Sequence, residues 1–310
     1  MTAVAAAALA GLPLHLPVTF RNAAFVLIGI SMGAAVTPET LSQLRAWPVS
    51  LVLLAVSVAA TLLVGTVWLE RVHGWDPVTA RYASIPGALS SVLILAATSS
   101  ADLPRVALAQ SIRLFTLVAL MPALLQLLGG DGGAPPPVAD HAVNAPDEIA
   151  VTLAASVGAA WALAALRVPG GVLLGAMVAS AALHGGGLVE GRFPPAILIL
   201  GFVTTGAVIG IRFRGVKLGQ ILATLPGGVA AVLVALLLSA CFALAGAVLL
   251  ALPFGQLWLA YAPGGVEAMA IMAFALHLDA AFVGAHHVVR LIGLNLLSPW
   301  WRRGRKDAPS

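Results

Sequence analysis

The stretch PGGVEAMAIMAFALHLDAAFVGAHHVVRLIGLNLLSP, from Pro263 to Pro299, decides the fold, because an earlier stretch of the chain repeats it. Shifted by 177 residues, PGALSSVLILAATSSADLPRVALAQSIRLFTLVALMP, from Pro86 to Pro122, aligns with it without a gap, and 11 of the 37 positions are identical. The polar identities carry the argument, since hydrophobic matches are common between membrane segments. They indicate two copies of one helical unit.

The composition places both copies in lipid. Of the 310 residues, 60% are hydrophobic and 9% are charged, whereas soluble domains carry about 25% charged residues. Apolar stretches of about 17–27 residues recur along the chain, long enough for membrane helices. The net charge of +4 lies mostly in short loops, where basic residues report membrane orientation rather than nucleic-acid binding. Cys241, the single cysteine, lies in an apolar run, which excludes a disulfide within the chain and favours packing on the lipid side.

We expect an all-α polytopic membrane protein with two homologous, inverted helical repeats, Pro-Gly-broken helices and about 9–11 membrane segments. The domains expected are a first repeat at 1–128, a Gly/Pro/acidic linker at 129–148, a second repeat at 149–301 and a basic tail at 302–310. The apolar segments are 2–17, 22–38, 46–69, 82–100, 106–128, 149–166, 168–184, 194–212, 226–252, 256–276 and 282–301.

The first repeat is short at its N-terminus, because 149–166 and the residues after it would pair with positions before Met1. Either this copy lost its opening helix or the true start codon lies upstream; the sequence favours the second. No basic residue precedes the first apolar stretch, which argues against a cleavable signal peptide. At the repeat offset Gly29 and Gly33 match Gly206 and Gly210, a spacing typical of close helix packing.

Loop charges predict the orientation. With the basic tail on the cytoplasmic side and Arg113 and Arg290 left out, a chain in which every segment spans the membrane has eight basic residues on the cytoplasmic side and six on the external side. If segments 82–100 and 256–276 instead enter and leave on one side, twelve lie inside and only Arg45 and Arg192 lie outside. The second arrangement obeys the positive-inside rule. It predicts inverted repeats in the bacterial inner membrane, with a cytoplasmic C-terminus.

Each copy has Pro-Gly in the middle of an apolar stretch, IPGALSS at 85–91 and APGGVEA at 262–268. Proline removes a backbone donor and glycine weakens a helix, so both helices should break there. One interpretation is a kink or tight packing between repeats. The other is a paired unwound site that binds a substrate or ion, formed by Pro86, Gly87, Pro263, Gly264 and Gly265.

Charged residues inside the apolar segments are the next candidates. Glu267 follows the second break and, at membrane depth, needs a partner or water; it is either an ion-responsive group or the cap of the outgoing helix. Arg113 and Arg290 each lie inside a membrane segment, at a cost of about 2.5–3.5 kcal/mol. Their available partners are the Pro-Gly carbonyls, Glu267 or an anionic substrate.

The remaining polar residues have both structural and functional interpretations. Asp102 and Asp279 precede their helices in the manner of N-caps. Gln110 and His287 lie three residues before their arginines and share a helical face with them, which suits interhelical hydrogen bonds or a substrate site, and His286 lies on the neighbouring stripe. A metal site from these histidines, His277 and Asp279 matches no established ligand spacing, so we expect no metal and no cofactor.

The two Pro-Gly stretches, and above all YAPGG and HHVVR, resemble the duplicated AbrB-type bacterial membrane family, over nearly the whole chain. Its copies read PGG, an acidic residue, and a Gln or His three residues before Arg. The first copy departs from this pattern, because Ala88 replaces the second glycine and Ser91 stands where an acidic residue is common. This shifts the expected site toward the second copy.

The resemblance carries two labels, ammonia monooxygenase and membrane regulator of gene expression. We found no convincing ligand set for an oxygenase and no soluble DNA-binding module. We therefore expect a transporter-like protein that moves or senses a small solute, with the arginines favouring an anion and with any effect on gene expression indirect. The expected partners are lipid and the solute, with no nucleic acid; a homo-oligomer, a monooxygenase subunit and a non-transporting regulator stay open.

Overall fold

The computed structural model describes residues 1–34, 47–86, 89–97, 99–128, 146–190 and 196–296, and all regular structure within these ranges is helical. The helices before the linker are α1 (Thr2–Leu9), α2 (Val18–Gly33), α4 (Trp47–His73), α5 (Pro77–Ser84), α6 (Leu89–Ala96) and α7 (Leu103–Leu127). Those after it are α8 (Pro146–Ala165), α9 (Gly171–Gly185), α10 (Ala196–Ile211), α11 (Leu218–Leu250), α12 (Phe254–Tyr261), α13 (Val266–Ala275) and α14 (Ala280–Leu296).

Four helices, α4, α7, α8 and α11, are long and apolar enough to cross a membrane. Their outer faces carry large apolar side chains, such as Leu63 on α4 (66% exposed) and Val248 on α11 (78% exposed). Their inner faces bury small polar residues, such as Ser57 and Ser239. An apolar outside with a partly polar inside suits lipid rather than water. The expectation of an all-helical membrane protein is therefore confirmed.

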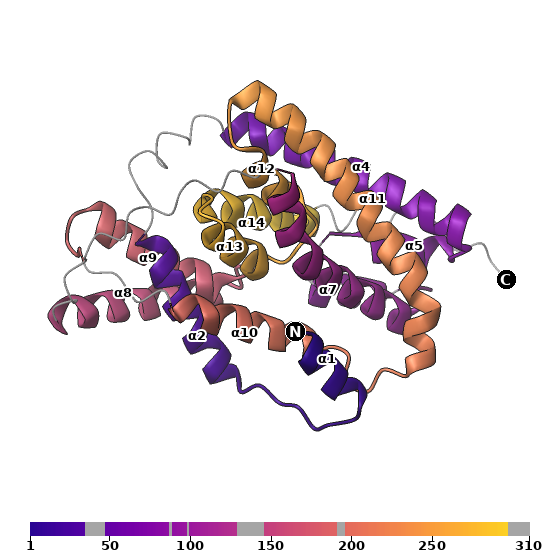
Figure 1. The fold of residues 1–310 in the computed structure, drawn as a ribbon, viewed down its shortest axis with the longest axis horizontal. Helices are drawn as coiled ribbons and strands as arrows, with labels where there is room; N and C mark the ends of the chain where they lie inside the picture. Colours follow the sequence, from indigo (N-terminus) through magenta and orange to yellow (C-terminus); the bar gives the residue numbers. More distant parts are fainter. Residues whose placement is uncertain (35–46, 87–88, 98, 129–145, 191–195, 297–310) are drawn as a thin grey trace.

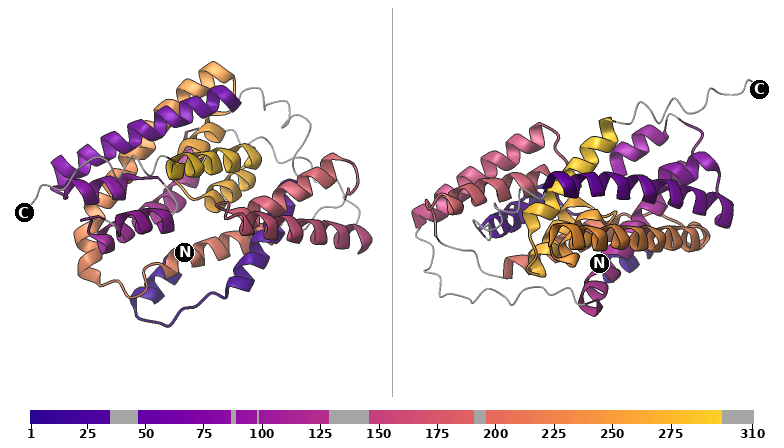
Figure 2. Two further views of the ribbon diagram at one scale, coloured as in Figure 1. Left: turned by 180° about the vertical axis from the view of Figure 1, so that it is seen from behind. Right: turned by 90° about the horizontal axis from the view of Figure 1, so that it is seen from above.

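The helices form two groups with α12, α13 and α14 between them (Figure 1). One group packs α4, α5, α7 and α11 together, and α4 and α11 lie side by side in every view (Figure 2). The other group packs α1, α2, α8, α9 and α10. The central helices touch both groups, α12 and α14 on α4, and α13 on α2 and α10. The second broken segment therefore lies where the two groups meet.

Close packing by small residues joins helices within the second group. A Cβ on Gly29 or Gly33 of α2 would clash with the backbone oxygens of Leu173 or Met177 on α9. On α10, a Cβ on Gly210 would clash with the Val4 side chain of α1, and a Cβ on Gly206 would lie tightly against Met1, the residue before α1. The predicted role of these glycines in close helix contacts is confirmed, because any side chain there would separate the helices.

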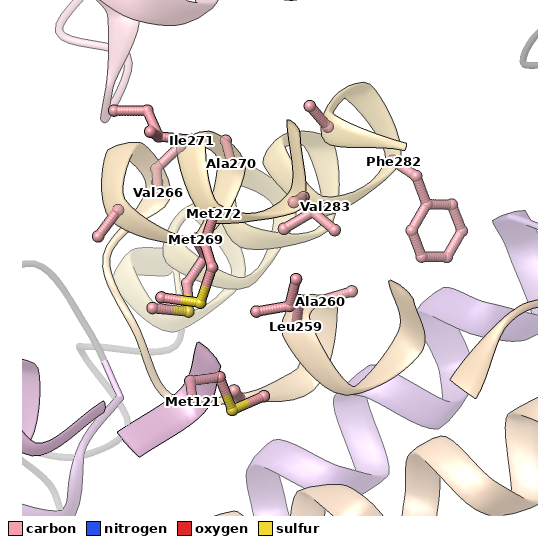
Figure 3. Close-up of a cluster of buried hydrophobic side chains, with 14 of the residues drawn as sticks. Met121, Leu259, Ala260, Val266, Met269, Ala270, Ile271, Met272, Phe282 and Val283 are labelled. Atoms are coloured by element: carbon pink, nitrogen blue, oxygen red, sulfur yellow. The ribbon is translucent and has the colours of Figure 1, made fainter. Parts of the chain in front are cut away.

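The core centres on α13, whose residues from Ala268 to Ala273 are all buried. Figure 3 shows Met269 and Met272 of α13 packed toward Leu259 of α12 and Met121 of α7. A helix that is apolar on every side is typical of an element enclosed by others. The second break, between α12 and α13, is therefore packed against this core.

Some segment boundaries differ from those predicted. The first apolar segment, 2–17, is helical only to Leu9, because Gly11 adopts a positive φ of 81° and Pro13 follows. α11 begins at Leu218 rather than 226 and accommodates Pro226 inside the helix. Residues 129–145 of the linker expected at 129–148 lie outside the described residues, as does the tail from 302 to 310. Residues 146–148, also expected in the linker, instead form the first turn of α8, where Asp147 and Glu148 suit the helix N-terminus.

Candidate functional site

The second Pro-Gly segment divides one apolar stretch into two helices, as predicted. α12 ends at Tyr261 and α13 begins at Val266. Because Pro263 has no backbone N–H, the carbonyl of Leu259, four residues earlier, loses its helical donor. His287 on α14 replaces that donor, with Nε2 2.9 Å from the Leu259 oxygen. A side chain of the neighbouring helix thus satisfies the carbonyl that proline leaves free, as buried backbone groups in lipid require.

Arg290 bonds the other carbonyls of this break. Its Nη1 donates to the Ala262 oxygen and its Nη2 to the Gly264 oxygen, both at 2.7 Å. Nη2 also lies 2.7 Å from Nδ1 of His287. Arginine can only donate and the Leu259 oxygen can only accept, so His287 is neutral, with its proton on Nε2. The guanidinium and the imidazole therefore hold the unwound backbone together.

The first break is bonded by equivalent residues. Pro86 frees the carbonyl of Tyr82, and Nε2 of Gln110 donates to that oxygen at 3.0 Å and to the Ile85 oxygen at 3.0 Å. Nη1 of Arg113 donates to the same Ile85 oxygen at 2.8 Å. The predicted interhelical bonds of the glutamine and the histidine are confirmed. Among the partners considered for the arginines, the structure selects the Pro-Gly carbonyls.

The bonds at the two breaks share one sequence separation. Four of these bonds join residues that are each 28 apart, namely Tyr82–Gln110, Ile85–Arg113, Leu259–His287 and Ala262–Arg290. Each break is therefore bonded by a helix that follows it at the same distance along the chain, α7 for the first break and α14 for the second. At the first break, Gly87 lies outside the described residues.

The two aspartates act as caps. Oδ1 of Asp102 accepts from the N–H of Arg105 at 3.0 Å, at the start of α7. Oδ1 of Asp279 accepts from the N–H of Phe282 at 2.9 Å, at the start of α14. Both bonds satisfy donors of a first helical turn. The predicted N-caps are confirmed.

His286 fastens α14 to α4 rather than to the break. Its Nδ1 lies 2.8 Å from the Phe282 oxygen, and its Nε2 lies 2.9 Å from Oγ of Ser50 on α4. That hydroxyl also lies 2.9 Å from the phenol oxygen of Tyr261, the last residue of α12. His286 is fully buried and stacks on the Phe282 ring at 3.9 Å. Its contacts join three helices around the core.

A cavity of about 370 Å³ opens beside the second break. Gly265 and Glu267 of the α13 N-terminus line it, together with three arginines from the second helix group, Arg21, Arg167 and Arg212. Glu267 is half-buried and within electrostatic reach of Arg212. Among the described residues Glu267 makes no hydrogen bond to the first turn of α13, whose N-cap is Gly265. Its carboxylate is therefore available to the cavity, and the capping interpretation finds no support.

A second, much smaller cavity lies between the two breaks. Its volume of about 20 Å³ has room for one water molecule. Ser84 and Arg113 line it from the first copy, and Pro263 lines it from the second. Within the described residues the Ser84 hydroxyl and Nε of Arg113 are buried without a hydrogen-bond partner. The two breaks thus approach each other.

The structure divides the predicted site residues into sets. Glu267 and Gly265 line the larger cavity. Four residues bond the carbonyls of the breaks: Gln110, Arg113, His287 and Arg290. His286 lies apart from both cavities. The backbone of Pro86, Pro263 and Gly264 forms the breaks themselves.

Three cavity arginines are absent from the predicted site. Arg21, Arg167 and Arg212 each follow or precede an apolar segment, so they report orientation in the sequence. Only the packing of α2, α8 and α10 brings them to one cavity. One sequence signal could have linked these three arginines: the orientation predicted from the loop charges places all of them on the same side of the membrane.

No group of three or more His, Cys, Asp or Glu residues converges in the part of the chain that the structure describes. Both ring nitrogens of His287 already bond protein atoms, and so do both of His286. The described geometry therefore lends no support to a metal-dependent oxygenase.

Membrane-length helices, two broken segments and arginines bonded to unwound backbone define an integral membrane protein of the broken-helix type. The chain belongs to the AbrB family, whose model, described as transition state regulatory protein AbrB, matches residues 1–304. It is similar to the Escherichia coli (strain K12) protein named "Putative regulator AbrB", with 27% identity over 294 residues covering 93% of this chain and 83% of the relative. It is also similar to "Uncharacterized protein YhjN" of Bacillus subtilis (strain 168), with 29% identity covering 89% and 76%. No solved structure matches the chain.

Proposed function

We propose that this AbrB-family protein is transporter-like and moves or senses a small solute through the cavity beside the second break. The observation that carries the proposal is the cavity itself, about 370 Å³, in the size range of small-molecule sites. It lies against unwound backbone at Gly265 and contains the half-buried carboxylate of Glu267. Broken helices that line a cavity are the usual binding elements of secondary transporters.

We propose that the two copies are inverted relative to each other. Bonds at the first break recur 177 residues later, with Gln110 and His287, then Arg113 and Arg290, in equivalent roles, which supports the duplication. The inversion rests on the loop charges, which favour Pro-Gly segments that enter and leave on one side. Inverted repeats allow one helix group to move against the other around a central site.

The basic loops orient the protein. Arg21, Arg167 and Arg212 meet at one cavity, which fits the arrangement that places all three in the cytoplasm. We infer a bacterial inner-membrane protein with several passes and a cytoplasmic C-terminus. In a Cys241→Ala background, a cysteine at Asp131 should react with an impermeant external thiol reagent, and a cysteine at Arg214 should not. The reverse pattern would overturn this orientation.

Within this proposal Glu267 is the ion- or proton-responsive group, because it is the carboxylate of the cavity. Arg113, Arg290, Gln110 and His287 are positioning residues, since they bond the break carbonyls. A solute effect on the cell would also account for a regulator name among the relatives. A change in gene expression would then follow from the solute rather than from contact with nucleic acid.

The experiment is a solute screen in cells that lack the protein and carry it back on a plasmid. Uptake and export are compared for wild type, Glu267→Gln and the matched control Glu190→Gln, whose side chain is exposed outside the cavity. A solute whose flux depends on the protein, fails with Glu267→Gln and survives with Glu190→Gln supports the proposal. Unchanged regulatory phenotypes in both Glu267→Gln and Arg290→Ala would instead indicate a non-transporting regulator. Stoichiometric copper or iron in the purified protein would favour the monooxygenase alternative.

A further inference from the structure

The larger cavity carries more positive than negative charge. Arg21 comes from the first turn of α2, Arg167 from the loop after α8 and Arg212 from the residue after α10. Among the described residues that line the cavity, Glu267 is the one that carries a carboxylate. Three guanidinium groups facing one carboxylate leave an excess of two positive charges, which an anion would balance.

The polar groups of the cavity are also incompletely bonded. Nη1 of Arg212 and Oγ1 of Thr205 are buried without a hydrogen-bond partner among the described residues, and Thr205 is only 7% exposed. Both line the cavity, Thr205 from α10 and Arg212 from the residue that follows this helix. Among the described residues, the side chain of Arg21 bonds only the neutral side chain of Asn22, at 2.9 and 3.2 Å. Buried donors without partners are costly, and a ligand with oxygen acceptors would satisfy these groups.

The intramembrane arginines do not fill this role. Arg290 already donates to the carbonyls of Ala262 and Gly264, and Arg113 to that of Ile85. Neither lines the larger cavity. The charge available to a solute therefore comes from the helix ends rather than from the Pro-Gly carbonyl clamps.

The rest of the wall is apolar. Apolar side chains contribute much of the lining, among them Phe25, Leu114, Leu173 and Val208. An inorganic anion gains nothing from such a wall, whereas a carbon chain buries apolar surface against it. Guanidinium forks match carboxylates in geometry as well as charge. The α13 N-terminus at Gly265 adds the positive end of a helix dipole.

We propose that this cavity binds a small organic carboxylate, held by Arg212, Arg167 and Arg21 with Thr205, and that Glu267 competes with it for Arg212. The proposal rests on the proposed function and names its substrate class. It also predicts the direction in which two substitutions change the affinity for the carboxylate. Removal of Arg212 weakens binding, and removal of the Glu267 charge strengthens it, because the anion then meets no carboxylate.

The test is calorimetric binding to the purified full-length protein in detergent, at constant ionic strength. The probes are succinate, butyrate, the neutral diamide of succinate and inorganic phosphate. Wild type should bind a carboxylate in preference to the diamide and to phosphate. Arg212→Gln should weaken carboxylate binding by about 10-fold or more, from the loss of charge-assisted bonds, and Glu267→Gln should tighten it several-fold. Arg214→Gln, an exposed arginine outside the cavity, should leave it unchanged.

Folding is monitored by the melting temperature and elution volume of each variant, and Arg212→Lys should recover part of the affinity. Equal binding of diamide and carboxylate, tighter binding of phosphate, or unchanged affinity in folded Arg212→Gln would each overturn the inference. Protein-dependent flux of a neutral or cationic solute without carboxylate binding would overturn the inference and leave the transporter proposal standing. Carboxylate binding without flux of any solute would overturn the transporter proposal and leave this inference standing.

Discussion

Replacing His287 tests how the second break is held. His287→Leu leaves the Leu259 oxygen without its donor and removes the acceptor that Nη2 of Arg290 meets at 2.7 Å. A buried unsatisfied acceptor costs about 1–3 kcal/mol, and a bond to a charged group contributes about 1.5–3 kcal/mol. The change should therefore destabilise the protein by about 2.5–6 kcal/mol. His287→Gln should cost less than about 1 kcal/mol, because its amide nitrogen can donate to the Leu259 oxygen, as the amide of Gln110 donates at the first break, while its amide oxygen can accept from Arg290.

The assay is thermal unfolding of the detergent-purified protein followed by tryptophan fluorescence. At about 2–4 °C per kcal/mol, His287→Leu should lower the melting temperature by at least about 4 °C, whereas His287→Gln should stay close to wild type. Equal melting temperatures for the leucine variant and wild type would refute the reasoning. So would a glutamine variant as unstable as the leucine variant, since the bond to the freed carbonyl would then not matter.

Two further changes test the packing and the caps. Gly33→Leu should destabilise the protein by about 1–3 kcal/mol, since the new side chain would clash with α9. Gly158→Leu is the control, because nothing lies within 4 Å of a Cβ at that position. Equal melting temperatures for the two variants would contradict the packing account. Asp279→Ala should cost about 0.5–2 kcal/mol by loss of the α14 cap, and Asp279→Asn should restore most of it. An asparagine variant no better than alanine would show that capping is not the role of this side chain.

Local chemistry made the breaks predictable. Proline at 86 and 263 removes a backbone donor, and the helices end before both as predicted. A Pro-Gly pair alone does not determine a break, however, because Pro226 and Gly227 lie inside α11. The caps at Asp102 and Asp279 are equally local, because each bonds an N–H three residues ahead. The helical spacing of Gln110 and His287 relative to their arginines predicted shared faces, and the structure adds the carbonyls they bond.

The cavity could not be predicted in this way. Arg21, Arg167 and Arg212 belong to segments far apart in the chain, and their meeting depends on how α2, α8 and α10 pack. No periodicity links such residues, so each looked like a solvated loop charge. The extent of helix in 2–17 was also misjudged, since apolar composition continues past Leu9 while the Gly11 turn ends the helix.

Access to the cavity from the two sides of the membrane tests the central claim most directly. Val208 lines the cavity and is half-buried, so Val208→Cys in a Cys241→Ala background places one thiol there; Val248→Cys, on the lipid-facing side of α11, is the control. The rate of labelling by an impermeant thiol reagent is measured in right-side-out and in inside-out vesicles. A transporter-like protein predicts reaction of the cavity thiol from both sides and none at the control position. Reaction from one side alone, under every solute condition tried, would contradict the account.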